Sequence, residues 1–446
     1  MTQSSEVGVI DVTEIINKNQ LGQYQKVIVF LIVLVFVMDG VANTVLPIAI
    51  PSIMSDWGVA RDAFKFVMGI GLFGVAIGAT LGGVIADKIG RKNALIGCVA
   101  VFGSMTVASA LTTNLYELAI LRTLDGLGIG GAIPAGMALL FESMPNRRRS
   151  LAIAASMVGI PLGGFLAGGL SSLLITDYGW QVLFIVAGSG PLLLAMVLLF
   201  SLPESPCFLV LKPAKWDALR ELLVRYGFEF NKGASFLEAE TKKAKFNVSH
   251  LFSIEFRAGT TLIWIAFFFC FIASYSMFSW GPVMMIGQGL SPKVMGQNIA
   301  VFNFSGVIGG LLSGWVIQKL GSKPSIVLYC TGGILSAVAC AYAFQYAAHS
   351  LPLSMGSVGA FGFFIAGILN LTYTMGANMY PTYIKGTGLG AGAGVGRIGA
   401  VASAFVGVAS LNYGAALGFF TVIAIATCIT LISLIAIRGQ IPRINV

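Results

Sequence analysis

Four ionisable residues stand inside long apolar runs of this sequence: Asp39, Arg122, Asp125 and Arg397. A charged side chain at the centre of a lipid bilayer costs about 2.5–3.5 kcal/mol on insertion scales, so such residues usually pair with one another or line a polar cavity. Arg122 and Asp125 are three positions apart and therefore share one face of a helix. Carboxylates and guanidiniums in such places indicate proton transfer and anion binding.

The two aspartates are candidates for carrying protons. Asp39 lies about 12 residues into the first apolar run, close to the middle of a bilayer core about 30 Å thick. We expect it to load and release a proton; the alternative is a fixed partner for an arginine. For Asp125 two hypotheses stay open, a second proton site or a residue that neutralises Arg122. The two histidines, His250 and His349, are expected in loops, so an intramembrane proton path would use carboxylates.

Arg397 is the candidate for binding an anion. No acidic residue follows Glu255 in the sequence, so Arg397 has no carboxylate partner in its own half of the chain. A guanidinium can hold a substrate carboxylate through two parallel hydrogen bonds; the alternative is a contact with Asp39 or with helix carbonyls. Aromatic and amide side chains could complete a pocket for a flat organic anion. A stripe of aromatic residues at helical spacing more often packs in the core or faces lipid. These side chains are Tyr275, Asn303, Asn370 and Tyr373.

The composition sets the class of protein that must position these residues. Of the 446 residues 57% are hydrophobic and 10% are charged, whereas a soluble domain carries about 25% charged residues. A membrane-spanning helix needs about 20 predominantly apolar residues. Runs of this kind lie at roughly 26–49, 65–86, 93–112, 116–141, 150–174, 181–202, 260–286, 295–318, 324–346, 353–378, 386–411 and 414–437. The sequence therefore predicts an all-α integral membrane protein with twelve transmembrane helices in two six-helix bundles.

A long polar stretch between the sixth and seventh runs divides the chain. We expect an N-terminal bundle over residues 26–202, a central linker over 203–259 and a C-terminal bundle over 260–437. Lysines and arginines concentrate in every second connection, which is the positive-inside pattern of cytoplasmic loops. This places the N-terminal segment 1–25, the linker and the tail 438–446 in the cytoplasm of a multi-pass cell-membrane protein, in a bacterium the inner membrane. It also accounts for the net charge of +9 without a nucleic-acid partner.

Two segments repeat between the halves. Residues 82–92 read GGVIADKIGRK, and residues 313–323 read SGWVIQKLGSK. Residues 142–149 follow the pattern E-x-x-P-x-x-x-R, and residues 378–385 follow N-x-x-P-x-x-x-K with the same spacing. Internal repeats of this kind are typical of transporters built from duplicated bundles.

The segment at 82–92 resembles the signature loop of the major facilitator superfamily, and a six-plus-six arrangement with a long central loop fits the same superfamily. Further segments are similar to its aromatic acid:proton symporter family. They are Asp39-Gly40, R-x-x-x-G-x-G-x-G from Arg122, PESP at 203–206 and YPTYIKGTGLGAGAGVGRIGA from Tyr380. The resemblance implies the major facilitator fold, alternating access and a proton-coupling pair of Asp39 and Arg122. It further implies a cytoplasmic gate formed by Asp87, Arg91, Glu142 and Arg149.

Two regions depart from that family's pattern. The family usually has a second acid three residues after its first, where this chain has Ala42, and a small polar residue where this chain has Asp125. In the C-terminal half, the positions matching the gate acids hold the amides Gln318 and Asn378. The position matching the gate arginine holds Ser322. We therefore predict a weaker gate in that half and a relative preference for the inward-open state.

Together these features predict proton-coupled uptake of a small organic acid, which by the resemblance is an aromatic carboxylate. The alternatives are a drug/proton antiporter, whose motif the segment GIPLGG at 159–164 partly resembles, a sugar-porter-like facilitator, and a membrane receptor that does not transport. No metal cluster, nucleophile motif or nucleotide-binding loop in the sequence supports an enzyme. We expect a proton gradient as the energy source without a cofactor. The expected partners are the organic anion, protons and lipid, with no nucleic acid, and the chain is expected to act as a monomer.

Overall fold

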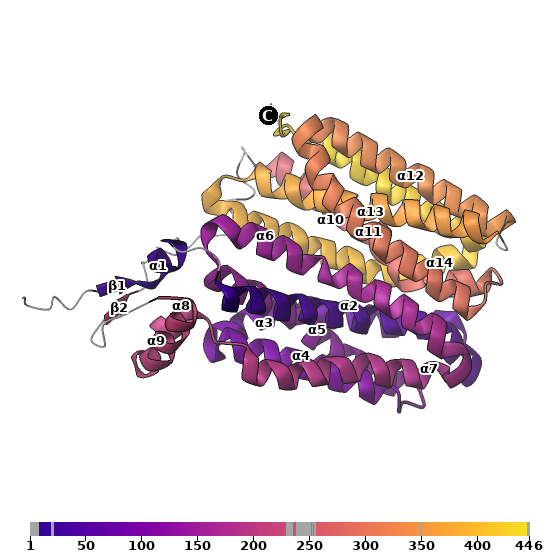
Figure 1. Cartoon of the computed structure of the whole chain (residues 1–446). Helices are drawn as coiled ribbons and strands as arrows, with labels where there is room; N and C mark the ends of the chain where they lie inside the picture. Colours follow the sequence, from indigo (N-terminus) through magenta and orange to yellow (C-terminus); the bar gives the residue numbers. More distant parts are fainter. Residues whose placement is uncertain are drawn as a thin grey trace, which may run out of the picture.

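The computed structural model of the chain describes residues 9–18, 22–228, 235–237, 251, 253, 256–347 and 350–443. Within them the protein is a bundle of long helices, with the N-terminal helices stacked beside the C-terminal ones (Figure 1). The described C-terminus and the first short elements lie toward the same end of this bundle. His250 and His349, which were expected in loops, lie outside the described residues.

The long helices cover the predicted apolar runs, and the largest difference is at α2, which continues to Trp57 where the run was predicted to end at residue 49. In the N-terminal half they are α2 (Gln23–Trp57), α3 (Phe64–Ile89) after the short η1 (Arg61–Ala63), α4 (Arg91–Ser109), α5 (Leu115–Ser143), α6 (Asn146–Met157) and α7 (Gly159–Ser201). In the C-terminal half they are α10 (Arg257–Gly287), α11 (Pro292–Leu320), α12 (Ser322–Tyr346), α13 (Leu351–Met379) and α14 (Thr382–Ala436). The all-α architecture predicted from the sequence is confirmed.

Ten helical stretches of the described chain are long and apolar enough to cross a membrane, and two of them are long enough to cross it twice. The stretch Asn146–Ser201 has 56 residues, or about 84 Å at 1.5 Å per residue, against a bilayer core of about 30 Å. Its backbone leaves the helical conformation at Gly179, and that of α14 does so at Gly414 and Ala415. Each of these stretches is therefore two spans, and the twelve predicted spans are present.

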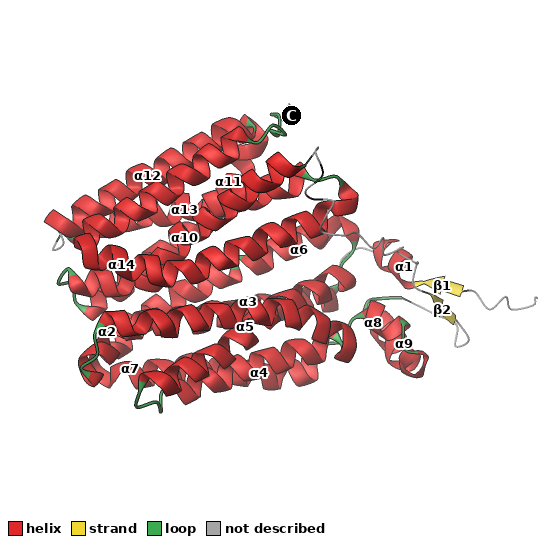
Figure 2. Cartoon of the chain, turned by 180° about the vertical axis from the view of Figure 1, so that it is seen from behind, coloured by secondary structure: helices red, strands yellow, loops and turns green. Residues whose placement is uncertain are grey.

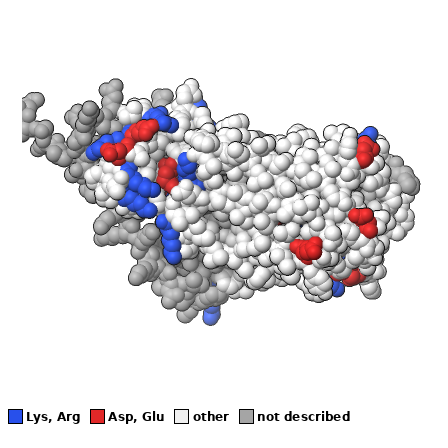
Figure 3. Space-filling model, turned by 90° about the horizontal axis from the view of Figure 1, so that it is seen from below, with Lys and Arg blue, Asp and Glu red and all other residues white. Residues whose placement is uncertain are grey.

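The surface agrees with burial in a bilayer. Figure 3 shows charged side chains gathered toward the two ends of the molecule, with a belt between them that is nearly free of charge. Large apolar side chains such as Phe73, Leu193 and Phe200 are exposed. A belt of this kind is what lipid requires, because charges cannot be solvated there.

Glycine brings α2 and α7 into close contact beside Asp39. A Cβ on Gly40 would lie 1.9 Å from the carbonyl oxygen of Ile160, and a Cβ on Gly163 would lie 2.0 Å from that of Val37. Small residues of this kind let helix backbones approach each other in lipid. The position of Asp39 is thus set by direct backbone contact between α2 and α7.

A small unit lies outside the long helices, at one end of the bundle (Figure 2). Its elements are β1 (Val9–Asp11), α1 (Val12–Lys18), α8 (Pro206–Val210), η2 (Pro213–Lys215), α9 (Trp216–Arg225) and β2 (Ser235–Leu237). The two strands pair in parallel, with Val9 opposite Ser235. The N-terminal segment and the central linker therefore pair with each other, which the sequence patterns did not predict.

Candidate transport site

Asp39 lies near the middle of α2, and its side chain is fully buried. The side-chain amide of Asn43, one turn further along, donates a hydrogen bond of 3.1 Å to Asp39 Oδ1. The other oxygen, Oδ2, has no hydrogen-bond partner among the described residues. Asp39 thus has one oxygen that is held in place and one that is available to a proton.

Arg122 and Asp125 form a buried ion pair on α5, with 2.8 Å between Nη1 and Oδ2. Their shared helix face was predicted from the spacing. Thr106 of α4 donates a hydrogen bond of 3.0 Å to Asp125 Oδ1. Arg122 Nη2 donates a bond of 3.4 Å to the carbonyl oxygen of Ala42, the position where the resemblance implied an acid. This arrangement is that of a carboxylate neutralising Arg122, and a proton-carrying role for Asp125 stays a prediction.

Arg397 lies half-buried on α14, and the ion pairs found within the described residues do not include it. Its charge acts on the hydroxyl groups of Tyr275 and Tyr373 and on the carboxylate of Asp39. It also lines a cavity of about 500 Å³ between α3 and α14. Cavities of this size are typical of small-molecule sites. The guanidinium is therefore available to an anion that enters between the two halves.

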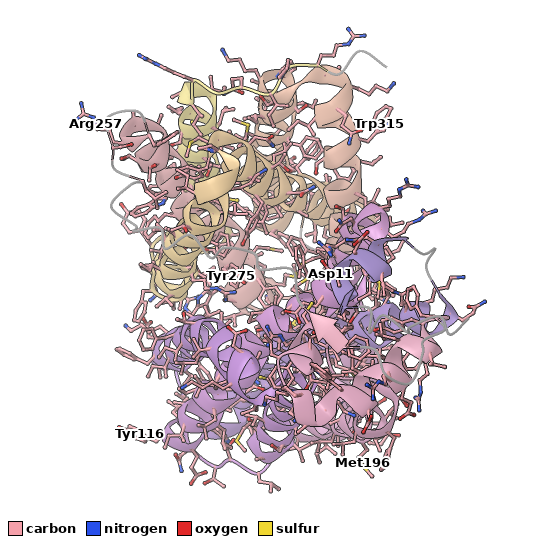
Figure 4. The ribbon with its side chains drawn as sticks, turned by 90° about the vertical axis from the view of Figure 1, so that its left-hand side faces the viewer. Asp11, Tyr116, Met196, Arg257, Tyr275 and Trp315 are labelled. Atoms are coloured by element: carbon pink, nitrogen blue, oxygen red, sulfur yellow. The ribbon has the colours of Figure 1, made fainter. Side chains whose placement is uncertain are left out.

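Tyr275 and Tyr373 belong to an aromatic cluster on α10 and α13. Tyr275 stacks on Phe271, with ring centroids 5.5 Å apart and planes 15° apart. Tyr373 meets Phe267 edge to face, with centroids 4.9 Å apart. Seen along the bundle, Tyr275 lies in the middle of the molecule, between the two halves (Figure 4). Aromatic rings near a guanidinium form a suitable surface for a flat aromatic anion.

The two amides predicted to join this pocket are engaged elsewhere. Asn303 donates to the carbonyl oxygen of Ile299 in its own helix at 2.9 Å, and a Cβ on Gly164 of α7 would lie 2.4 Å from its Oδ1. Asn370 donates to the carbonyl of Gly310 at 2.9 Å and so joins α13 to α11. The hydrogen bonds of the described residues thus place both amides at helix contacts, and their role in binding substrate stays a prediction.

Three of the four residues predicted to form the gate lie together. Arg91 Nη2 lies 2.8 Å from an oxygen of Asp87 and 3.0 Å from an oxygen of Glu142, so one guanidinium joins α3, α4 and α5. The hydroxyl of Ser205, just beyond α7, donates to Glu142. The fourth residue, Arg149, lies over the ring of Phe141, 3.9 Å from its centroid, outside this group of ion pairs.

The matching positions of the C-terminal half carry no such network within the described residues. The amide of Asn378 donates to the carbonyl of Thr374 in its own helix at 2.9 Å. Ser322 instead contacts the segment after α14. Its hydroxyl donates to Gln440 Oε1 at 2.5 Å and accepts from the backbone amide of Ile441 at 2.9 Å.

At the opposite end of the bundle, the side chain of Asn412 joins the two halves. Arg61 Nε donates to Asn412 Oδ1 at 2.6 Å, and Asn412 Nδ2 donates to Asp62 Oδ2 at 2.7 Å. We call this group, Arg61, Asp62 and Asn412, the outer clasp. No local sequence pattern indicates this group, because 351 positions separate Arg61 from Asn412. Asn43 was also missed, although its i+4 spacing from Asp39 was a usable signal.

Comparisons with known proteins agree with this architecture. The Major Facilitator Superfamily profile matches residues 31–404. A gallate transporter of Pseudomonas putida is 33% identical over 407 residues, 91% of this chain and 90% of that protein. A 4-hydroxybenzoate transporter of Acinetobacter baylyi is 33% identical over 411 residues, 90% of this chain and 88% of that protein. A crystal structure of a D-xylose–proton symporter superposes with a TM-score of 0.72 at 16% identity, covering 95% of this chain and 99% of the other. The chain belongs to the Major Facilitator Superfamily.

Proposed function

We propose that this transporter imports an aromatic carboxylate together with protons, by alternating access. The observation that carries the proposal is the guanidinium of Arg397, which has no ion-pair partner among the described residues. It lines a cavity between α3 and α14 and interacts electrostatically with Tyr275 and Tyr373. Relatives that are 33% identical over about nine-tenths of the chain are transporters of gallate and of 4-hydroxybenzoate. An unpaired guanidinium among aromatic rings provides what such a substrate needs.

The coupling of proton and substrate follows because the carboxylates of Asp39 and of the substrate compete for the guanidinium of Arg397. Ionised Asp39 attracts Arg397, because the two act on each other electrostatically. A proton on Asp39 removes that attraction and leaves Arg397 free for the substrate carboxylate. By linkage, a bound carboxylate in turn favours the protonated form of Asp39. Proton and substrate therefore bind together and leave together, which is the requirement for symport.

Alternating access would come from rocking of the two halves about the central site. We assign the end that carries α1, α8 and α9 to the cytoplasm, on the basis of the lysines and arginines in its connections. The outer clasp then lies at the external end, where it holds the halves together. On this assignment the structure corresponds to a state that is closed to the outside.

The proposal is tested by transport into proteoliposomes that contain the purified protein. We expect 4-hydroxybenzoate or gallate to accumulate when the proton gradient is directed inward, and to equilibrate without accumulation when the gradient is absent. D-xylose and a cationic drug serve as controls for the two alternative transport classes. Accumulation of the drug against its gradient, or uptake of D-xylose in place of the acids, would overturn the proposal.

Two variants test the proposed roles of Arg397 in binding the substrate and of Asp39 in carrying the proton. Arg397→Lys keeps the charge but loses the planar fork, so we expect the apparent KM for the acid to rise about tenfold or more. Asp39→Asn removes the proton carrier, so we expect accumulation to be lost while exchange of labelled for unlabelled acid persists. Unchanged KM in Arg397→Lys, or gradient-driven accumulation by Asp39→Asn, would remove the respective residue from the mechanism.

A further inference from the structure

Beside the Arg122–Asp125 ion pair lies a small cavity that the proposed function does not use. Its volume is about 30 Å³, and it lies where α2, α3, α5 and α10 meet. Its polar lining comes from both halves of the protein: Asn43, Arg122 and Asp125 from the N-terminal half and Ser279 from the C-terminal half. A polar cavity of this size has room for at least one water molecule.

Ser279 is the residue that the described structure leaves unexplained here. Its side chain is 1% exposed, and its hydroxyl has no hydrogen-bond partner among the described residues. Buried hydroxyl groups in proteins nearly always have a partner, which is often an ordered water. Because Ser279 lines the cavity, a water molecule there would satisfy its hydroxyl.

The cavity also borders the residue that holds Asp39. Asn43 uses its Nδ2 group to donate to Asp39 Oδ1, which leaves its amide oxygen for another donor. A water that donates to this oxygen polarises the amide and strengthens the bond from Nδ2 to the carboxylate, since chains of hydrogen bonds reinforce one another. The amide is thus a link from the cavity to the ionised form of Asp39.

We propose that this cavity binds water, and that Ser279 holds the water against Asn43, so that the C-terminal half adjusts the proton affinity of Asp39. Ser279 is then a positioning residue for proton coupling, acting through water and Asn43. The inference rests on the proposed function only for the meaning of Asp39 as the proton carrier. The water site itself depends on groups from both halves, so it exists only while α10 lies against α2 and α5.

Other charged groups near Asp39 enter the same balance. They are Asp125 from α5, which pairs with Arg122, and Arg397 from α14. Tyr275 of α10 also interacts electrostatically with Asp39. Ser279 carries no charge, so its replacement by alanine removes none of these charges and changes the polar lining of the cavity alone.

The test compares two serines on the same helix. Ser276 is, like Ser279, 1% exposed with an unpartnered hydroxyl among the described residues, but it does not line the cavity. The full-length protein is reconstituted as wild type, Ser279→Ala, Ser279→Thr and Ser276→Ala. The carboxylic-acid band of Asp39, identified by its loss in Asp39→Asn, is titrated against pH by infrared spectroscopy. This readout needs no transport, so it stands even if the proposed substrate fails.

Loss of the water weakens the bond to the ionised carboxylate, so the protonated form persists to higher pH. We expect the titration midpoint in Ser279→Ala to move upward by about half a pH unit, a threefold change in proton affinity. In Ser276→Ala the titration midpoint of Asp39 should equal that of the wild type. Ser279→Thr keeps a hydroxyl at this position and should therefore keep the wild-type midpoint. An unmoved midpoint in Ser279→Ala, or equal shifts in both alanine variants, would overturn the inference.

Discussion

In the N-terminal half the start of α4 is held by charged groups, whereas in the C-terminal half the start of α12 is held by neutral ones. Arg91 joins α3 and α5 through Asp87 and Glu142, and the carboxylate of Glu204 accepts from the backbone amide of Lys92 at 3.0 Å. In the other half the start of α12 is tied, within the described part of the chain, to the segment after α14 through the hydroxyl and the backbone amide of Ser322. The first arrangement unites several helix ends, and the second fixes one.

The difference concerns side chains, because the backbone at the two positions is alike. Gly90 precedes α4 with φ 104° and ψ 152°, and Gly321 precedes α12 with φ 82° and ψ 174°. The segment that holds each helix start also follows the last helix of its half. The repeat has thus kept its backbone while exchanging ion pairs for neutral hydrogen bonds. We infer that the helix ends of the N-terminal half move as one body, while those of the C-terminal half shift independently.

The largest expected effect comes from the glycine of the charged end. In Gly90→Ala, a side chain would adopt a positive φ, which costs about 1–3 kcal/mol, and its Cβ would lie 2.0 Å from an oxygen of Glu204. Glu204 would have to move, which breaks its hydrogen bond with the backbone amide of Lys92. We expect a clear fall in the melting temperature in detergent, and a smaller one for Gly321→Ala, whose nearest neighbour is 3.1 Å away.

Gly83→Ala is the matched control for that comparison, because nothing lies within 4 Å of its added Cβ and its backbone is helical. It should leave the melting temperature unchanged or raise it slightly, as alanine favours a helix more than glycine does. Equal losses in Gly90→Ala and Gly321→Ala would mean that the two ends tolerate a side chain equally, against the comparison.

The second effect concerns the coupling between helices at each end. Arg91 and Glu142 are largely shielded from water, with 13% and 15% of their side chains exposed. A double-mutant cycle of Arg91→Ala and Glu142→Ala should give a coupling energy of about 1–2 kcal/mol. The matching cycle of Ser322→Ala and Asn378→Ala should give none, because Asn378 bonds within its own helix. A measurable coupling in the second cycle would contradict independent helix ends there.

The third effect is the dependence of thermal stability on ionic strength, which differs between neutral hydrogen bonds and ion pairs. Ser322→Ala removes two neutral hydrogen bonds, each worth about 0.5–1.5 kcal/mol. The resulting loss of thermal stability should be the same at low and high ionic strength, since neutral hydrogen bonds are not screened. The loss caused by Asp87→Asn should shrink as salt rises, because the side chain of Asp87 is 65% exposed in its ion pair with Arg91. Melting curves at two salt concentrations check both expectations, and a salt-dependent effect of Ser322→Ala would count against the neutral contact.

The elements that sequence alone could predict are those set by local pattern. Runs of about twenty apolar residues predict membrane spans because a bilayer requires that length. The family resemblance pointed to Arg91 and Glu142, and the spacing of Arg122 and Asp125 predicted a shared face that the ion pair confirms. Nothing in these inferences depends on how one helix is rotated against another.

The remaining contacts depend on that rotation, which a single sequence does not encode locally. Asn303 was assigned to a pocket by its type, yet it lies at a helix contact with Gly164. Ser322 was interpreted only as the loss of the arginine that matches Arg91, whereas its hydroxyl donates to Gln440. Gln440 lies in a polar tail without hydrophobic periodicity, so no sequence pattern indicates this contact. Asn412 meets Arg61 only because two distant helices cross at that point. Such contacts come from tertiary packing, and they make up most of what distinguishes the two ends.

The smallest expected effect is the one that would make the two ends alike. Gln318→Asp with Asn378→Glu restores both gate acids beside Lys319 and Lys323 of the C-terminal half. Exposed ion pairs are worth only about 0–1 kcal/mol, so the population closed toward the cytoplasm should grow by about fivefold at most. A cysteine at Thr80, which lines the cavity of Arg397, reports this as slower labelling by a water-soluble maleimide.

Gln318→Asn with Asn378→Gln is the control, because it changes the same positions without adding charge. If the acidic pair slows labelling and the neutral pair does not, missing charge is what loosens the C-terminal end. If the cysteine is labelled at the same rate in the acidic and the neutral double variants, the missing charge does not control opening of the C-terminal end. The neutral contact of Ser322 would then be a sufficient attachment for α12 by itself, and the two ends would differ in chemistry but not in their resistance to opening.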